Sequence, residues 1–171
     1  RKVDEMAAEL NQLGYRALPY HAGMTDDRRK QNQEAFSSER CDIIVATVAF
    51  GMGIDKSNVR YVIHAQLPKS LEAYQQESGR AGRDGLDAEC CLFYTRGDYN
   101  TWSRLLNQTG EINARESSID SLGLMLDFCT GITCRHKAIV NHFGQEFTAE
   151  SCNACDVCLG EVELIDDALV V

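Results

Sequence analysis

Two arginines, Arg80 and Arg83, carry the clearest chemical signal in this sequence of 171 residues. They lie three residues apart within residues 75–85, and a glycine precedes each of them. Arginine presents a planar, permanently charged fork that pairs bidentately with phosphate, and small neighbours let a phosphate approach closely. The spacing therefore predicts a loop that contacts the terminal phosphate of a nucleotide.

The loop that would hold the rest of such a nucleotide does not occur in the sequence. The GxxxxGK[ST] pattern, whose backbone amides cradle phosphates, is not found at any position. We therefore expect another part of a larger protein to hold the nucleotide, and this chain alone to be inactive.

A second group of reactive side chains lies near the C-terminal end. Cys152, Cys155 and Cys158 place three thiols within seven residues. A tetrahedral metal ion can gather such thiols, whereas disulfides between them would be strained. We predict a closed structural Zn²⁺ site with Cys134 as the fourth ligand, because the start of a helix stabilises a thiolate.

Other interpretations of the cysteines stay open at this point. Cys129, His136 and His142 are alternative fourth ligands. Disulfide bonding is one alternative to zinc, although nothing marks the chain as secreted, and an iron–sulfur cluster is another. The remaining cysteines are expected to be small buried hydrophobic residues: Cys41, Cys90 and Cys91.

Alternating helices and strands must position the two arginines. Apolar spacing predicts a helix over residues 3–13, and Thr25 and Ser70 are expected to cap two further helices. Strands are predicted at residues 16–20, 42–46, 59–64 and 88–94. Continuous apolar strands that alternate with helices indicate an α/β fold, in which helices cover both faces of a parallel sheet. Ligands of such sheets bind at the carboxyl ends of the strands, where His21, Thr47 and Gly51 emerge.

After about residue 101 the pattern becomes purely helical. Ser118 is predicted to cap a helix that Gly131 ends, and a second helix over residues 134–143 completes a hairpin. The predicted domains are an α/β lobe at residues 1–101 whose first strand precedes Arg1, a helical zinc-binding module at 102–160, and a lead into an absent domain at 161–171.

The net charge of −9 is unevenly distributed. Residues 1–105 hold 14 Lys and Arg against 15 Asp and Glu, whereas residues 106–171 hold 3 against 11. The first part could therefore offer nucleic acid a local basic face, although for the run at residues 28–30 alone a solvated surface is at least as good an interpretation. The residues of this predicted basic face are Arg28, Arg29, Lys30, Lys56 and Arg60.

Composition argues against a membrane protein. Hydrophobic residues make up 44% of the chain and charged residues 25%, as in globular proteins. Its apolar runs fall far short of the roughly 20 residues that span a bilayer, and no basic-then-apolar leader opens it. We expect an intracellular protein with no membrane partner.

Four features in this order resemble RecQ-family DNA helicases: residues 20–23 (Tyr-His-Ala-Gly), residues 45–55, the arginine run and the cysteine cluster. The resemblance covers nearly the whole chain, as a second RecA-like lobe, a helical hairpin and a zinc module. It implies an ATP-dependent motor that moves 3′ to 5′ on single-stranded DNA and opens duplexes. The resemblance also implies a first RecA-like lobe, which holds most of the ATP and Mg²⁺, and a winged-helix domain that engages duplex DNA.

The resemblance assigns roles to individual residues. Arg83 matches the arginine finger and Arg80 its partner, which would neutralise charge on the transferred phosphoryl group. Gln76 would link this loop to the nucleotide or to an acidic motif of the opposite lobe. The other positions that match ATP contacts are Gly51, Gly53, Asp55 and Gly79. Asp55 could instead cap a helix or a turn.

The positions that match DNA contacts are His21, Ala22, Gly23 and Thr47. Hydroxyl and backbone N–H groups at strand ends suit phosphates, although His21 could instead be a packed polar residue. One alternative function is another helicase of the same superfamily, which the cysteines oppose; the other is a non-catalytic, zinc-bearing DNA- or protein-interaction module. The implied compartment is the cytoplasm and nucleoid in a bacterium, or the nucleus in a eukaryote.

Overall fold

The computed structural model describes residues 2–47, 50, 56–108 and 112–162. The chain forms two compact units. The first unit comprises Arg1–Arg60 and Arg80–Ala88, and the second comprises Tyr61–Gly79 and Glu89–Val171. Each unit contains one pair of parallel strands.

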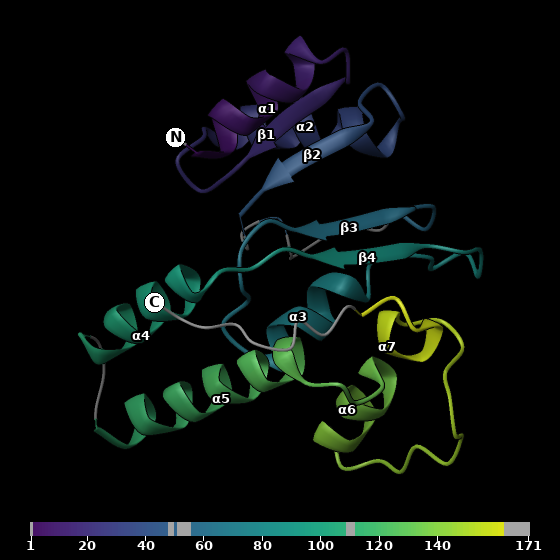
Figure 1. Cartoon of the computed structure of the whole chain (residues 1–171). Coiled ribbons are helices and arrows are strands. Elements are labelled where there is room, and N and C mark those ends of the chain that lie inside the picture. Colours follow the sequence, from purple (N-terminus) through teal and green to yellow (C-terminus); the bar gives the residue numbers. More distant parts are fainter. Residues whose placement is uncertain (1, 48–49, 51–55, 109–111, 163–171) are drawn as a thin grey trace. The chain divides into compact units, whose positions relative to one another are not determined.

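In the first unit, helices pack against a parallel strand pair (Figure 1). The elements are α1 (Lys2–Gln12), β1 (Ala17–Tyr20), α2 (Asp26–Ser37) and β2 (Ile43–Ala46). The register pairs Ala17 with Ile43 and Tyr20 with Ala46, so both strands end at the same edge. Two side-chain amides connect the helices to β1: that of Asn11, an exposed residue, donates from Nδ2 to the Ala17 carbonyl at 2.8 Å, and that of the buried Asn32 donates from Nδ2 to the Pro19 carbonyl at 2.7 Å.

The second unit combines a strand pair with the remaining helices. Its elements are β3 (Tyr61–His64), α3 (Leu71–Ser78), β4 (Glu89–Leu92), α4 (Arg96–Asn107), α5 (Ile112–Thr130), α6 (Arg135–His142) and α7 (Asp156–Leu159). One core joins α3 to α5, and its buried residues are Leu67, Leu71, Tyr74, Leu122, Met125 and Phe128. The indole N–H of Trp102 on α4 donates to the Leu67 carbonyl at 2.8 Å. Helical hairpin and α/β elements thus share one interior in this unit.

Most predicted helix starts are confirmed, and one is wrong. Thr25 and Ser70 cap α2 and α3, each accepting a hydrogen bond from a backbone N–H of the first turn. Ser118 does not cap α5, because that helix already begins at Ile112 and the Ser118 hydroxyl donates to the Ala114 carbonyl inside it. The predicted domain boundary at residue 101 lies within α4, which Thr95 and Asp98 begin with a capping box.

None of the described helices is long and apolar enough to cross a membrane.

Candidate metal centre and arginine loop

The structure brings the thiols of Cys134, Cys152, Cys155 and Cys158 to one point. All four Sγ atoms lie within 4.8 Å of one another. A tetrahedral ion with Zn–S bonds of about 2.3 Å separates its sulfurs by roughly 3.8 Å, so the cluster fits a zinc ion with little adjustment. No other such group of three or more His, Cys, Asp or Glu side chains is found in the described part of the chain.

Helix starts and backbone amides surround these sulfurs. Cys134 precedes α6 and its side chain makes no capping hydrogen bond, so its sulfur is available as a ligand. Cys155 precedes α7, and its sulfur accepts from the backbone N–H groups of Arg135 at 3.4 Å and Cys158 at 3.5 Å. The Cys152 sulfur accepts from the Cys155 N–H at 3.3 Å. Such N–H donors stabilise thiolates, the form that binds metal.

Local hydrogen bonds also favour ionisation at the last cysteine. The pKa of Cys158 is lowered to about 6, mainly by a hydrogen bond with Ser151 and next by one with the backbone of Cys152. By contrast, burial raises the pKa of the Cys129 thiol to about 11. Cys129, His136 and His142, the alternative fourth ligands, do not belong to the cluster.

Arg135 braces the metal centre from its place directly after Cys134. Its Nη2 and Nε donate to Asp156 at 2.8 and 2.9 Å, and its Nη1 donates to the carbonyls of Gly131 at 2.9 Å and of Phe128. The guanidinium also lies 5.5 Å from the centre of the Phe128 ring. One side chain therefore ties the end of α5 and the start of α6 to α7.

The loop that carries Arg80 and Arg83 has a defined backbone. Gly82 adopts φ +63°, and a Cβ there would lie 2.9 Å from the Leu86 carbonyl oxygen. Its N–H donates to the Val59 carbonyl at 3.0 Å, and the Asp84 N–H donates to the Ser57 carbonyl at 3.2 Å. The turn requires glycine, and backbone hydrogen bonds hold it against residues 57–59.

The side chain of Arg60 holds this loop through hydrogen bonds to the residues that follow Arg83. Its Nη2 contacts both carboxylate oxygens of Asp84 at 2.5 and 2.6 Å, and its Nη1 donates to the Asp87 carbonyl at 2.8 Å. The hydrogen bond from Arg60 holds the pKa of Asp84 below its usual range. Arg60 thus fixes the segment that follows Arg83.

These pairings contradict the predicted basic face at three of its five positions. Arg60 is paired with Asp84, Lys56 lies 3.4 Å from Glu39, and Arg29 pairs with Asp26. A neighbouring carboxylate offsets each of these three positive charges. The surface is therefore less basic than the sequence predicts.

The other predicted nucleotide contacts divide between described and undescribed residues. Gln76 is exposed on α3, and Gly79 ends that helix, where a Cβ would lie 2.8 Å from the Gln75 carbonyl oxygen. Gly51, Gly53 and Asp55 lie outside the described residues.

The predicted DNA contacts gather at one edge of the first strand pair. His21 follows β1 and Thr47 follows β2, so the parallel register brings both positions to the carboxyl edge, with Ala22, Gly23 and Thr47 exposed. Both ring nitrogens of His21 are engaged, Nε2 at 3.1 Å from the Asp4 carboxylate and Nδ1 at 3.2 Å from the Gly23 N–H. His21 is therefore a half-buried residue with a polar partner on each ring nitrogen, and its contact with DNA stays a prediction.

Sequence reasoning missed the side chains that hold the candidate sites in place: Arg60, Glu72, Glu77, Arg135 and Asp156. Two of them had a usable signal, because Arg135 and Asp156 directly follow Cys134 and Cys155 in the sequence. Arg60 had none, since its partner Asp84 lies 24 residues away.

Comparison with known proteins first identifies the class of protein to which the chain belongs. Residues 1–85 match the family "Helicase conserved C-terminal domain", and residues 96–159 match "RecQ zinc-binding". A solved structure of the E. coli DEAD-box protein SrmB, bound to regulator of ribonuclease activity A, shares the fold with a TM-score of 0.53 and 23% identity, over 64% of this chain and 65% of that one. The fold is thus a RecA-like α/β lobe followed by a helical zinc-binding region.

Sequence relatives then give the family. The chain is 44% identical to the ATP-dependent DNA helicase RecQ of Pasteurella multocida over 92% of its length, and 40% identical to that of Bacillus subtilis, also over 92%. It is 43% identical over 94% of its length to the RecQ-like DNA helicase BLM of Xenopus laevis. The chain belongs to the RecQ family. It spans about a quarter of the two bacterial relatives, 25% and 27%, and 12% of the frog protein.

Proposed function

We propose that the protein containing this chain is an ATP-dependent DNA helicase that moves 3′ to 5′ on single-stranded DNA and opens duplexes. The observation that carries the proposal is the braced Arg80–Arg83 loop in a chain whose next segment is a RecQ zinc-binding region. This combination is expected of a motor's second lobe, and this chain alone should be inactive.

In the proposed motor, this chain supplies positive charge to ATP that the first lobe holds together with Mg²⁺. Arg83 acts as the arginine finger and Arg80 as its partner, and they stabilise charge on the transferred phosphoryl group. Support for this comes from the glycine turn and the Arg60 brace, which limit the entropy lost when the loop orders around phosphate. The remaining proposed ATP contacts are Gly51, Gly53, Asp55, Gln76 and Gly79.

The proposed DNA path follows the carboxyl edge of β1 and β2. Exposed backbone and hydroxyl groups at Ala22, Gly23 and Thr47 would contact phosphates without reading sequence, and His21 would shape the turn through Asp4. Alternating grip by two lobes, driven by ATP binding and hydrolysis, would move the strand.

We propose Zn²⁺ as a structural ion held by Cys134, Cys152, Cys155 and Cys158. Four thiolates close the coordination shell, so the ion contributes folding energy and no open position for chemistry. We also propose the division into a lobe at residues 1–101, a zinc module at 102–160 and a lead at 161–171 into a winged-helix domain that engages duplex junctions. Such a protein would act in the bacterial cytoplasm at the nucleoid, or in the eukaryotic nucleus.

The test is strand separation by the full-length protein on duplexes with either a 3′ or a 5′ single-stranded overhang. We expect ATP-dependent unwinding of the 3′-overhang substrate alone, and none with a non-hydrolysable ATP analogue. DNA binding without nucleotide-dependent unwinding would instead favour the non-catalytic interaction module.

A further inference from the structure

Two imidazole–carboxylate pairs hold helix α3, the helix that ends at Gly79 directly before Arg80. His142, the last residue of α6, places Nε2 2.6 Å from Glu72 Oε1, and His64 on β3 places Nε2 2.8 Å from Glu77 Oε2. His142 belongs to α6, the helix that Cys134 precedes, and His64 belongs to strand β3. Helix α3 is therefore tied at its first turn to the zinc-binding region.

The pair of His142 and Glu72 lies on the face of α3 that carries the proposed nucleotide contacts. Glu72, Gln75, Gln76 and Gly79 follow one another at the i, i+3, i+4 and i+7 spacing of one helical stripe. The residues that bury α3 in the core, Leu71 and Tyr74, belong to a different stripe. The core thus fixes one face of the helix, and His142 fixes the face to which Gln76 belongs.

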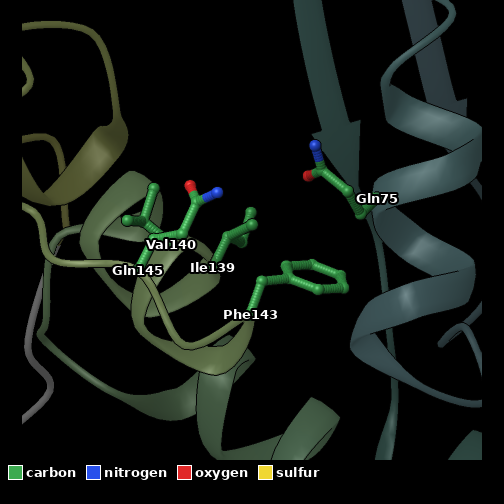
Figure 2. Close-up of a pocket in the computed structure, with 5 residues that line it drawn as sticks. All are labelled: Gln75, Ile139, Val140, Phe143 and Gln145. Carbon is green, nitrogen blue, oxygen red and sulfur yellow. The ribbon is translucent and has the colours of Figure 1, made fainter.

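Apolar packing between α3 and α6 lies beside an open groove: Ala138 and Ile139 of α6 pack against the core that contains Leu71 and Tyr74 of α3. An open groove of about 510 Å³ is lined by Gln75 on α3 and by Ile139, Val140, Phe143 and Gln145 on the α6 side (Figure 2). His142 itself is half-buried and stacks edge-on against Phe143, with ring centres 5.2 Å apart. Beside this open groove, the hydrogen bond between His142 and Glu72 is a direct polar link between the two helices.

The charge on Glu72 is favourable for such a link. The hydrogen bond with His142 lowers the pKa of Glu72 to about 2. The carboxylate is therefore ionised at neutral pH and accepts a hydrogen bond from the imidazole N–H. A bound metal would also anchor the other end of α6, because Cys134 directly precedes this helix.

We propose that His142 is a positioning residue of the motor: through Glu72 it sets the orientation of α3 and thereby the position of Gln76 at the nucleotide. This inference rests on the proposed function, and it gives the zinc region a defined effect on ATP affinity. The proposed contact of Gln76 exists in both ground and transition states, so losing its position should raise KM for ATP and leave kcat largely unchanged.

The experiment measures ATP hydrolysis by the full-length protein in His142→Ala, Glu72→Gln and the double variant. We expect KM for ATP to rise by about 5- to 50-fold in each single variant, within the usual range of coupling between sites. Because both changes remove one interaction, the double variant should be no worse than either single variant. His136→Ala, an exposed histidine on the same helix, is the matched control and should leave KM unchanged.

A merely structural role predicts a different result. It would lower kcat in proportion to the folded fraction while KM stays at the wild-type value, and that outcome overturns the inference. Hydrogen exchange supplies an independent readout: residues 75–79 should exchange faster in His142→Ala with zinc content unchanged, and unaltered exchange there would also overturn it. Failure of the proposed function is distinguishable, because the wild-type protein would then hydrolyse no ATP.

Discussion

The metal centre and the arginine loop are built alike but differ in completeness. Each is a short polar segment braced by one arginine, Arg135 at the cysteines and Arg60 at the loop, and each brace reaches a carboxylate and at least one backbone carbonyl. All four candidate metal ligands come from this chain, however, whereas in the proposed function the loop offers cations to a phosphate held by another lobe. The metal centre should thus form in this chain alone, and the loop should act only in the whole protein.

The largest expected effect comes from removing a metal ligand. Cys155→Ser should abolish zinc binding and unfold the region around α6 and α7, because structural zinc supplies roughly 10–16 kcal/mol in comparable small sites. Elemental analysis should find one zinc per wild-type chain and none in the variant. Cys90→Ser, which changes an exposed cysteine outside the cluster, should keep its zinc; equal zinc content in the two variants would refute the ligand assignment.

Removing the brace of the metal centre should have a smaller effect on the same ion. Arg135→Ala deletes the contacts to Asp156 and to the end of α5, so we expect zinc affinity to fall by about 10- to 100-fold while stoichiometry stays at one. Competition with a chromogenic chelator measures this change. Arg104→Ala, which changes an exposed arginine on α4, is the matched control. Identical zinc affinities of Arg135→Ala and Arg104→Ala would show that Arg135 does not support the site.

Removing the brace of the arginine loop should leave zinc untouched. Arg60→Ala loses the contacts of Nη2 with both carboxylate oxygens of Asp84 and the hydrogen bond of Nη1 to the Asp87 carbonyl, and we expect Tm to fall by roughly 2–4 °C. Hydrogen exchange should rise locally at residues 80–88. Arg60→Lys keeps the charge without the planar fork and should restore only part of the loss; full restoration would mean that the fork geometry is unimportant.

The smallest expected effect is a pH dependence that belongs to the loop. Arg60 lowers the folded-state pKa of Asp84 below the ordinary value of 3.8, so this carboxylate stabilises the fold above that pH and loses its contribution as the pH falls further. The difference in urea midpoint between wild type and Asp84→Asn should therefore shrink as pH drops below about 4. A difference that is constant with pH would indicate that Asp84 acts only through its shape.

What the sequence could predict follows from the range of each interaction. The Cys152-x-x-Cys155-x-x-Cys158 spacing and the glycines beside Arg80 and Arg83 are local patterns, and the family match agrees with the metal and helicase predictions. Caps at Thr25 and Ser70 were also local and are confirmed. Ser118 was misjudged because a serine inside a helix can satisfy its hydroxyl on a carbonyl four residues back.

The interactions that sequence reasoning missed join residues far apart in the chain. His142 and Glu72 are separated by 70 positions and Arg60 and Asp84 by 24. The basic face failed in part for the same reason, since Lys56 meets Glu39 only after folding, whereas Arg29 and Asp26 are only three residues apart in the sequence. Charges can be counted from a sequence, but their partners depend on the fold.

The most direct test of the account is the rate of ATP hydrolysis by the full-length protein with Arg83→Ala. An arginine finger predicts a fall in kcat of about 10³- to 10⁵-fold, with zinc content and Tm at wild-type values. Arg28→Ala, which changes an exposed arginine outside the loop, should keep wild-type kcat. The loss of an arginine finger should lower kcat far more than twofold. A kcat for Arg83→Ala within about twofold of wild type would therefore contradict the claim that this loop completes the ATP site.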